Sequence, residues 1–499
     1  MPTKPTQVDR AAKNRWSAPE RATRGHARRR REGQSSREPV LPAPRPFPVG
    51  DAATRGFADM GVPANLVAAL VADGISKPFP IQAATIPDAL AGRDVLGRGR
   101  TCSGKTLAFG LPMIIRLAGS SGAARPQPRG LVLVPTRELA MQVADVLARL
   151  ARSAGLSLVL VAGGMPYAPQ TLALSRGVDI VVATPGRLID LMDQGIADLS
   201  RIEITVLDEA DHMADLGFLP AVTQILDTVP DRGQRLLFSA TLDHAVDRLV
   251  RNYLHEPVAH EVDNGQASVP TMSHHLVSIA PQHKAALTAE IASRQGRTLI
   301  FVRTQRGADR VALQLRGSGV LAGALHGGLA QGARTRILSA FKDGSLRVLV
   351  ATDVAARGIH VDEVGLVLHA DPPSGPKEYL HRAGRTARAG GTGAVVALAL
   401  PHQRRELERL TMQAGVRPKV LTVLPGDSAL AAATGARRAS GEAVTDADYQ
   451  RVIAPPPARR LHSAGASRGN SGVRGKGRPG RRRSPTSTAV GGSPSRRAR

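Results

Sequence analysis

One short segment of the sequence has residue types and spacing that suit phosphate binding. Residues 99–106 read GRTCSGKT and fit the pattern G-x-x-x-x-G-K-[ST]. The two glycines allow a tight curl that turns backbone N–H groups toward phosphate oxygens. Lys105 adds a positive charge, Thr106 offers a hydroxyl to Mg²⁺, and the helix predicted to start here favours anions at its N-terminus. A chance glycine-rich turn is the alternative. The segment predicts a nucleotide-binding loop made of Gly99, Arg100, Thr101, Cys102, Ser103, Gly104, Lys105 and Thr106.

A pair of adjacent carboxylates follows an apolar run further along the chain. The run ITVL at residues 204–207 leads directly into Asp208 and Glu209. Ligands of parallel sheets bind at the carboxyl ends of the strands, so both side chains are expected at that edge. We predict that Asp208 holds Mg²⁺, partly through water, and that Glu209 orients or deprotonates an attacking water. An acidic turn after a strand is the alternative, and the phosphate loop upstream argues against it.

Short apolar runs separated by helical stretches must position these residues. Runs such as GLVLVPT, DIVVATP and RLLFSAT are typical of buried parallel strands, and RELAMQVADVLARLAR has the apolar spacing of a helix. A second series, which includes TLIFVRT and RVLVATD, begins after the polar segment EVDNGQASVP. This alternation predicts an α/β chain with two similar domains built on parallel sheets. The predicted ranges are 51–262 and 272–425 for the domains, 263–271 for a linker, and 1–50 and 426–499 for disordered basic tails.

The net charge of +26 over 499 residues is concentrated near the two ends of the sequence. Residues 1–50 contain 12 Lys and Arg against 4 Asp and Glu, and residues 451–499 contain 13 against none. Segments of this composition bury too little apolar surface to fold. We interpret them as polyanion-binding arms, chiefly for nucleic acid, with a solubilising or targeting role as the alternative.

The cysteine content and the hydropathy exclude other classes of protein. The single cysteine, Cys102, excludes an intramolecular disulfide and a cysteine-based zinc site, and it suits a reducing cytoplasm. No apolar run reaches membrane-spanning length, so we expect no membrane partner.

Ordered motifs surround the two carboxylates. Residues 208–211 spell D-E-A-D, and the chain also contains PFPIQ, PTRELA, GG, TPGR, SAT, HGGLAQGAR, ATDVAARGI and HRAGRTARAG in that order around them. Over roughly residues 55–425 the chain resembles the DEAD-box RNA helicases. The resemblance implies two RecA-like domains that bind ATP and RNA, with Mg²⁺ as the metal.

The resemblance also assigns roles to individual residues. Gln82 would pair with adenine and Phe57 would pack on the base, although a surface amide and a core ring are the alternatives. Arg385 and Arg388 would reach the γ-phosphate. The implied RNA contacts, mostly to sugar and phosphate with weak sequence preference, come from Pro135, Thr136, Arg137, Gly163, Gly164, Thr184, Pro185, Gly186, Arg187, Gln331, Arg334 and Thr352. The residues implied in coupling ATP to RNA are Asp211, Ser239, Thr241, Asp353, Arg357, His360 and His381.

Five positions depart from the family pattern: Phe79, Gly99, Cys102, His360 and Ala387, of which Cys102 and His360 matter most. Cys102 stands where the family usually has glycine, which indicates a need for a small side chain. His360 stands where the family normally has aspartate, at a position expected to contact the ribose. His360 can donate a hydrogen bond but brings no fixed negative charge, so the strength of coupling at this position is in question.

These observations together predict an ATP-dependent RNA helicase that unwinds short duplexes locally or remodels RNA–protein complexes. A DNA helicase of the same superfamily is one alternative, and an ATP-independent RNA chaperone that acts through the basic tails is another. We expect a cytoplasmic monomer, with ribosomal or RNA-decay proteins as candidate partners.

Overall fold

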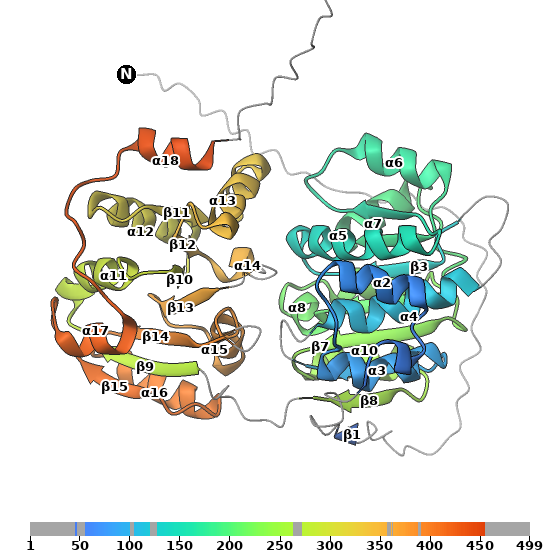
Figure 1. Cartoon of the computed structure of the whole chain (residues 1–499), viewed down its shortest axis with the longest axis horizontal. Helices are drawn as coiled ribbons and strands as arrows, with labels where there is room; N and C mark the ends of the chain where they lie inside the picture. Colours follow the sequence, from blue (N-terminus) through green and yellow to red (C-terminus); the bar gives the residue numbers. More distant parts are fainter. Residues whose placement is uncertain are drawn as a thin grey trace, which may run out of the picture. The chain divides into compact units, whose positions relative to one another are not determined.

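The computed structural model describes residues 45–46, 55–99, 104–119, 127–262, 272–356, 361, 363–387 and 391–454. These residues form two parallel sheets flanked by helices, so the predicted fold class is confirmed (Figure 1). Several predicted site residues lie outside the described part of the chain: Arg100, Thr101, Cys102, Ser103, Arg357, His360 and Arg388. The predicted linker at 263–271 lies outside it as well.

The first sheet has eight strands in the order β1-β8-β2-β7-β6-β3-β5-β4. Every pairing is parallel, and the central strands are apolar and fully buried, as expected for a sheet that is covered on both faces. The strands are β1 (Arg45–Pro46), β2 (Val95–Arg98), β3 (Gly130–Leu133), β4 (Leu158–Val161), β5 (Ile180–Ala183), β6 (Ile204–Asp208), β7 (Gln234–Ser239) and β8 (Val258–Glu261).

Two separate apolar cores cover the two faces of this sheet. Side chains alternate along each strand, so Val132 enters one core while Leu131 and Leu133 enter the other. The first core packs against η1 (Ala58–Met60), α2 (Ala64–Ala72), α3 (Pro80–Leu90), α4 (Lys105–Gly119) and α5 (Arg137–Ser153). The second packs against α6 (Tyr167–Arg176), α7 (Pro185–Asp193), α8 (Ala210–Asp215), α9 (Leu219–Leu226) and α10 (His244–Tyr253).

The second sheet has seven parallel strands in the order β11-β12-β10-β13-β14-β9-β15. Its strands are β9 (Met272–Ser278), β10 (Arg297–Phe301), β11 (Ala322–Leu325), β12 (Val348–Ala351), β13 (Val364–His369), β14 (Gly393–Ala399) and β15 (Lys419–Thr422). The flanking helices are η2 (Pro281–His283), α11 (Lys284–Ala292), α12 (Gln305–Gly317), α13 (Gln331–Asp343), α14 (Asp353–Ala356), α15 (Pro376–Ala383) and α16 (Arg404–Gln413). None of the helices in the described residues combines the length and apolarity that a membrane span requires.

The described structure extends into both predicted tails. Beyond residue 426 the chain forms α17 (Ser428–Thr434) and α18 (Asp446–Ile453), so the prediction of disorder is wrong for this part. Leu430 is fully buried, and Tyr449 packs in the core of the second sheet beneath the Arg316 guanidinium, 4.5 Å from its ring centroid. Near the N-terminus, β1 adds a short parallel strand beside β8. The remaining tail residues lie outside the described ranges.

Two buried histidines of the second sheet, His274 and His369, contact Tyr379 of α15. His369 on β13 is fully buried, and its ring meets the Tyr379 ring edge-on with centroids 5.0 Å apart. His274 on β9 shares a hydrogen bond with the Tyr379 hydroxyl, from Nδ1 to Oη at 2.8 Å. Burial lowers the pKa of His274 to about 4 and holds the pKa of His369 well below its ordinary value of 6.5.

These two histidines predict that acid destabilises the second sheet. Both histidines have folded-state pKa values below the unfolded value, so their contribution to stability is complete above about pH 6.5 and is lost as the pH falls toward 4. Each should add about 1.4 kcal/mol per pH unit to the slope of unfolding free energy. We expect His369→Leu to reduce that slope by about 1.4 kcal/mol per pH unit, the contribution of one proton, measured by urea unfolding at several pH values. The control is His402→Leu, at an exposed position, which should leave the slope unchanged. Parallel slopes for wild type and His369→Leu would contradict this.

Candidate functional site

The phosphate loop joins the end of β2 to the start of α4. Gly104 has a φ of +85°, a conformation that glycine adopts without strain, and a Cβ there would lie 2.4 Å from Gln82 Nε2. Lys105 begins α4, is 6% exposed, and donates from Nζ to the Gly99 carbonyl at 3.1 Å. This hydrogen bond uses one of the three N–H donors of the ammonium, which leaves two that can meet anionic oxygens. The described part of the loop therefore fits a phosphate group.

The two predicted adenine contacts, Gln82 and Phe57, are both buried. Gln82 is fully buried, accepts from the Phe79 N–H at 2.8 Å and donates to the Gly104 carbonyl at 2.9 Å. Its amide thus ties the start of α3 to the phosphate loop and still has one donor and one lone pair. Phe57 is 2% exposed and packs in the first core, so its contact with a base stays a prediction.

The two adjacent carboxylates lie at the end of β6, both buried. Asp208 Oδ1 accepts from the Glu209 N–H at 2.9 Å. Glu209 has a φ of +50° and stands directly before α8, a left-handed conformation that is unusual outside glycine. This turn brings Glu209 Oε2 within 3.1 Å of His212 Nδ1, one turn along α8.

The surroundings of Asp208 and Glu209 shift their pKa values in opposite directions. Burial raises the pKa of Asp208 to about 7, against the lowering effect of Lys105. Burial also acts on Glu209, but His212, followed by Arg385 and Lys105, outweighs it and lowers its pKa to about 2. Neighbouring carboxyls with separated pKa values are a feature of acid–base sites.

The third carboxylate of the motif is held by the next strand. Asp211 Oδ2 accepts from the Thr241 N–H at 3.1 Å and from Thr241 Oγ1 at 2.9 Å. Ser239 Oγ accepts from the Asp211 N–H at 3.3 Å and donates to the Thr241 carbonyl at 2.7 Å. The end of β7 is therefore fixed to α8, so Asp211, Ser239 and Thr241 come together as the sequence predicted.

This donor set fits a magnesium ion that takes a few ligands from the protein and the others from water and a bound phosphate. Among the described residues no group of three or more His, Cys, Asp or Glu side chains could hold a metal by itself. Mg²⁺ usually takes one or two protein carboxylates and completes its shell with water and phosphate oxygens. Asp208 and the half-buried Thr106 are the residues that would hold it.

The predicted RNA contacts of the first sheet cluster at the starts of α5, α6 and α7. Arg137 Nη1 donates to the Gly163 carbonyl at 2.9 Å, and the Gly163 N–H donates to Thr184 Oγ1 at 3.4 Å. Gly164 has a φ of +73°, and a Cβ there would lie 2.0 Å from Arg137 Nη1. The structure therefore brings Arg137, Gly163, Gly164 and Thr184 together, with Pro135, Thr136, Pro185, Gly186 and Arg187 beside them in the chain, and their contact with RNA stays a prediction.

Ion pairs link residues of the two sheets and their helices. Arg334 at the second sheet pairs with Glu138 of α5 at 2.9 Å, and Lys377 of α15 pairs with Asp215 at 3.0 Å and Asp243 at 2.9 Å. His381 Nε2 lies 3.7 Å from Asp211 Oδ2, which is long for a direct hydrogen bond. Gln331 begins α13, and Thr352 is buried directly before α14. The structure thus brings predicted residues of both sheets near one another.

Neighbouring arginines of α15 and its C-terminal turn have different surroundings. Arg382 is 2% exposed and binds Asp353 through two nitrogens, at 2.6 and 2.7 Å, as well as Glu378 and the Asp371 carbonyl. Asp353, predicted as a coupling residue, therefore serves first to neutralise Arg382. Arg385, 3% exposed, instead affects Glu209 through its charge.

Sequence reasoning missed four residues of this site: Glu138, His212, Lys377 and Arg382. His212 was detectable as the polar residue three positions after Glu209 on a helix. Glu138 and Lys377 form contacts between elements that are far apart in the chain, and no local pattern indicates them.

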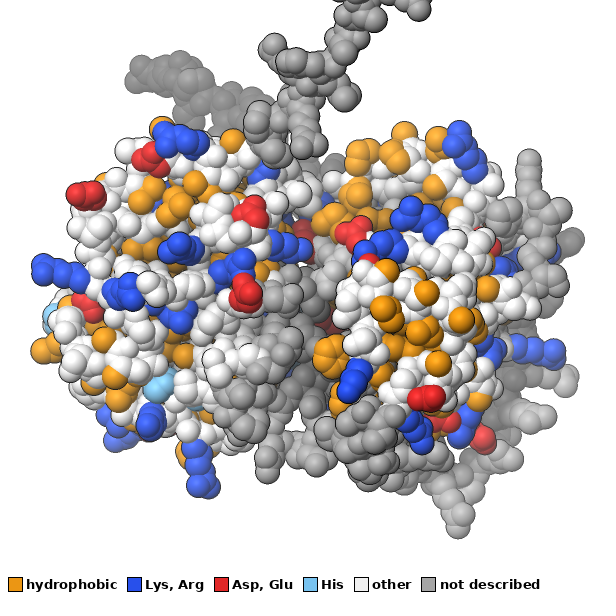
Figure 2. All heavy atoms as spheres, in the orientation of Figure 1, with side chains coloured by type: hydrophobic (Ala, Val, Ile, Leu, Met, Phe, Trp, Pro, Cys, Tyr) orange, Lys and Arg blue, Asp and Glu red, His pale blue; other side chains and the backbone are white. Residues whose placement is uncertain are grey.

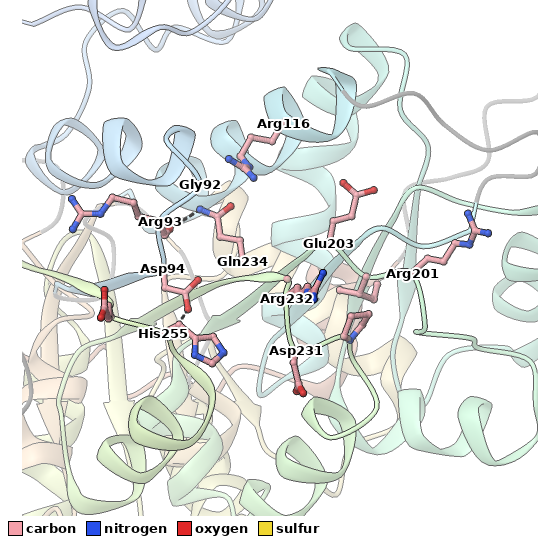
Figure 3. Close-up of a pocket in the computed structure, with 14 residues that line it drawn as sticks. Gly92, Arg93, Asp94, Arg116, Arg201, Glu203, Asp231, Arg232, Gln234 and His255 are labelled. Carbon is pink, nitrogen blue, oxygen red and sulfur yellow. Dashed lines mark hydrogen bonds between the residues drawn. The ribbon is translucent and has the colours of Figure 1, made fainter. Parts of the chain in front are cut away.

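A separate hollow of about 640 Å³ opens at the opposite edge of the first sheet (Figure 3). It is lined by the turns before β2, β6, β7 and β8 and by Arg116 of α4. Asp94 there accepts from the backbone N–H groups of Arg235 and His255, at 2.7 Å each. These turns precede the strands, whereas the predicted site residues follow them, so the hollow is distinct from the candidate site.

Comparisons with known proteins agree with this geometry. The DEAD/DEAH box helicase family model matches residues 79–249, and the Helicase conserved C-terminal domain matches residues 282–390. The chain is 40% identical over 377 residues to DEAD-box ATP-dependent RNA helicase 3A, chloroplastic, of Zea mays, covering 74% of this chain and 50% of that protein. It is 39% identical over 384 residues to ATP-dependent RNA helicase RhlB of Xanthomonas oryzae pv. oryzae, covering 74% and 67%. The chain thus spans half to two-thirds of the length of these relatives.

A solved structure shares the fold over both sheets. S. cerevisiae Dbp5 bound to RNA and ADP BeF3 is 26% identical, with a TM-score of 0.68, and the match covers 75% of this chain and 97% of that one.

Proposed function

We propose that this chain, which belongs to the DEAD-box helicase family, is an RNA helicase that hydrolyses ATP to ADP and phosphate. It would separate short RNA duplexes locally or remodel RNA–protein complexes. The observation that carries the proposal is the buried group of Lys105, Asp208 and Glu209, which Asp211 ties to Ser239 and Thr241. The candidate phosphate site and the candidate RNA surface would thereby be joined through the short helix α8.

The residues of the chain divide the work on ATP. Bound Mg²⁺ would neutralise phosphate charge, held by Asp208 and Thr106. Lys105 contributes a fixed positive charge at the helix N-terminus. Glu209, ionised and held by His212, is placed to orient a water and to accept its proton. Arg385 contributes a guanidinium whose charge suits the equatorial oxygens of the transferred group.

The RNA surface and the ATP site are coupled through side chains that span both. Asp211 contacts Thr241 and lies near His381, while Glu138 pairs with Arg334. Arg334 and the neighbouring Arg137 are both candidate RNA contacts, so RNA binding would act directly on the ion pair between the sheets. Lys and Arg side chains also outnumber Asp and Glu on the face seen in Figure 2, which suits a polyanion.

Two alternatives remain to be tested against this proposal. A DNA helicase would use the same phosphate site but would not need to contact a 2′-hydroxyl. An ATP-independent chaperone would need only the basic tails. The intact buried group argues against the second, since three ionisable side chains are costly to keep buried without a role.

Location and partners are further proposals. We propose a cytoplasmic monomer that meets ribosomal or RNA-decay proteins, on the basis of the single cysteine and the basic ends. Among relatives, two are named as chloroplastic and one as mitochondrial.

One assay decides between these functions. We expect ATP hydrolysis to rise on addition of single-stranded RNA, to rise far less with DNA of the same sequence, and to vanish when EDTA removes Mg²⁺. Equal stimulation by DNA would favour the DNA helicase. Strand annealing with no ATP hydrolysis in the presence of RNA would favour the chaperone.

A further inference from the structure

An exposed aromatic side chain stands beside the candidate RNA contacts of the first sheet. Tyr167 begins α6, three residues after Gly164, and 42% of its surface is exposed. The chain has only four tyrosines, and aromatic residues make up 3% of its sequence. An aromatic ring left at the surface next to a ligand site is a candidate contact rather than part of the core.

The ring of Tyr167 rests on the guanidinium of Arg187. The Arg187 guanidinium carbon lies 3.9 Å from the ring centroid, and the side chain of Arg187 is only 8% exposed. Arg187 Nη1 donates to the Met165 carbonyl at 3.1 Å, and its Nε lies 3.7 Å from Asp190 Oδ2. The guanidinium plane is therefore fixed from both sides, and it holds one face of the ring in place.

The surroundings of the ring leave room for a nucleic-acid strand. A Cβ built on Gly163 or on Gly186 would meet no atom within 4 Å, so the backbone is open at both positions. Gly163 is itself held by Arg137 and Thr184, both candidate contacts for sugar and phosphate. A strand whose backbone followed these groups would carry its bases past the start of α6.

We propose that Tyr167 is a stacking platform for one unpaired RNA base, with Arg187 fixed behind it. This inference rests on the proposed function, because it assumes that RNA binds at the starts of α5, α6 and α7. Stacking of a base on an aromatic ring tolerates any sequence, since every base has a π-face. It would add base contact to a surface that otherwise offers backbone N–H groups, hydroxyls and charge. By alanine substitution such a contact changes affinity by about 5- to 150-fold.

A second role for the ring must be separated from stacking. Tyr167 could act only by holding Arg187, which would then contact phosphate. In that case the loss of the ring would weaken RNA binding whether or not a base is present. A stacking role makes the effect depend on one particular base.

The test uses the full chain and a fluorescein-labelled single-stranded RNA of 12 nucleotides, with binding measured by anisotropy at fixed salt. The variants are Tyr167→Ala, Tyr167→Phe and Tyr167→Leu, with Leu172→Ala as the matched control. Leu172 lies on the same helix and is 49% exposed. A set of RNAs with one abasic nucleotide at each position in turn reports which base is stacked, and thermal melting checks that each variant is folded.

We expect Tyr167→Ala and Tyr167→Leu to weaken binding at least 5-fold, and Tyr167→Phe and Leu172→Ala to bind like wild type. The wild type should bind one of the abasic RNAs more weakly than the intact RNA. The Tyr167→Ala variant should bind that abasic RNA and the intact RNA equally well. Unchanged binding by folded Tyr167→Ala, or an equal loss with every abasic RNA, would overturn the inference while leaving the proposed function intact. Failure of the wild-type chain to bind RNA would overturn both.

Discussion

Replacing Glu209 with glutamine is expected to lower the rate of ATP hydrolysis by about 100-fold or more while ATP and RNA still bind. Glutamine keeps the size of the side chain and can still form a hydrogen bond with His212, so the turn before α8 should persist. An amide cannot accept the proton of an attacking water. The loss should therefore appear in the rate of the chemical step rather than in the affinities.

The measurement is single-turnover hydrolysis with saturating RNA, together with the Kd for ATP and the melting temperature. Glu406→Gln, an exposed position on α16, serves as the control and should behave like wild type. Hydrolysis by Glu209→Gln at the wild-type rate would show that another group handles the water.

Replacing Lys105 with alanine should abolish ATP binding rather than slow the chemical step. The ammonium is buried, donates to the Gly99 carbonyl, and is the nearby positive charge that most strongly counters the raised pKa of Asp208. Without it, the carboxyl groups of Asp208 and Glu209 lie beside the phosphate loop with no ammonium to offset them, and both attraction and hydrogen bonds to phosphate are lost. We expect the affinity for ATP to fall by at least about 100-fold, as for loss of a charge-assisted contact in a buried site.

Titration calorimetry with ATP and Mg²⁺ measures this directly. Lys342→Ala, at an exposed position of α13, should leave binding unchanged. RNA binding in the absence of ATP should persist in the Lys105→Ala variant. An ATP affinity within a factor of three of wild type would contradict the assignment of Lys105.

The sequence predicted the parts of the site that depend on local order. Asp208 had to lie at a strand end because an apolar run precedes it, and Lys105 had to lie at a helix start because of its loop. The apolar run RLLF likewise placed Ser239 and Thr241 at a strand end, whereas their link to Asp211 was implied by the family resemblance. In each case one short segment contains both the residue and the element that positions it.

Contacts between distant segments could not be predicted in this way. Tyr167 and Arg187 are 20 positions apart and meet only because α6 and α7 start at the same edge of the sheet. Arg382 stands in the motif HRAGRTARAG, which does not indicate its partners: Asp353 and the Asp371 carbonyl from other segments, and Glu378 from its own helix. The prediction of a disordered, Arg/Gly/Ser-rich tail from residue 426 is wrong for 427–454, which contains apolar residues such as Leu430, Tyr449 and Ile453. They pack only because the second sheet supplies the complementary surface.

The backbone at Glu209 imposes a trade-off on any effort to engineer this protein. A side chain with a φ of +50° costs about 1–2 kcal/mol, and the fold tolerates this because the turn aims the carboxylate. Glycine or asparagine would relieve that cost, so a search for heat-resistant variants that scores stability alone will favour replacements at 209 that cannot turn over ATP. Selection for robustness in this protein should therefore be coupled to a readout of hydrolysis at every round.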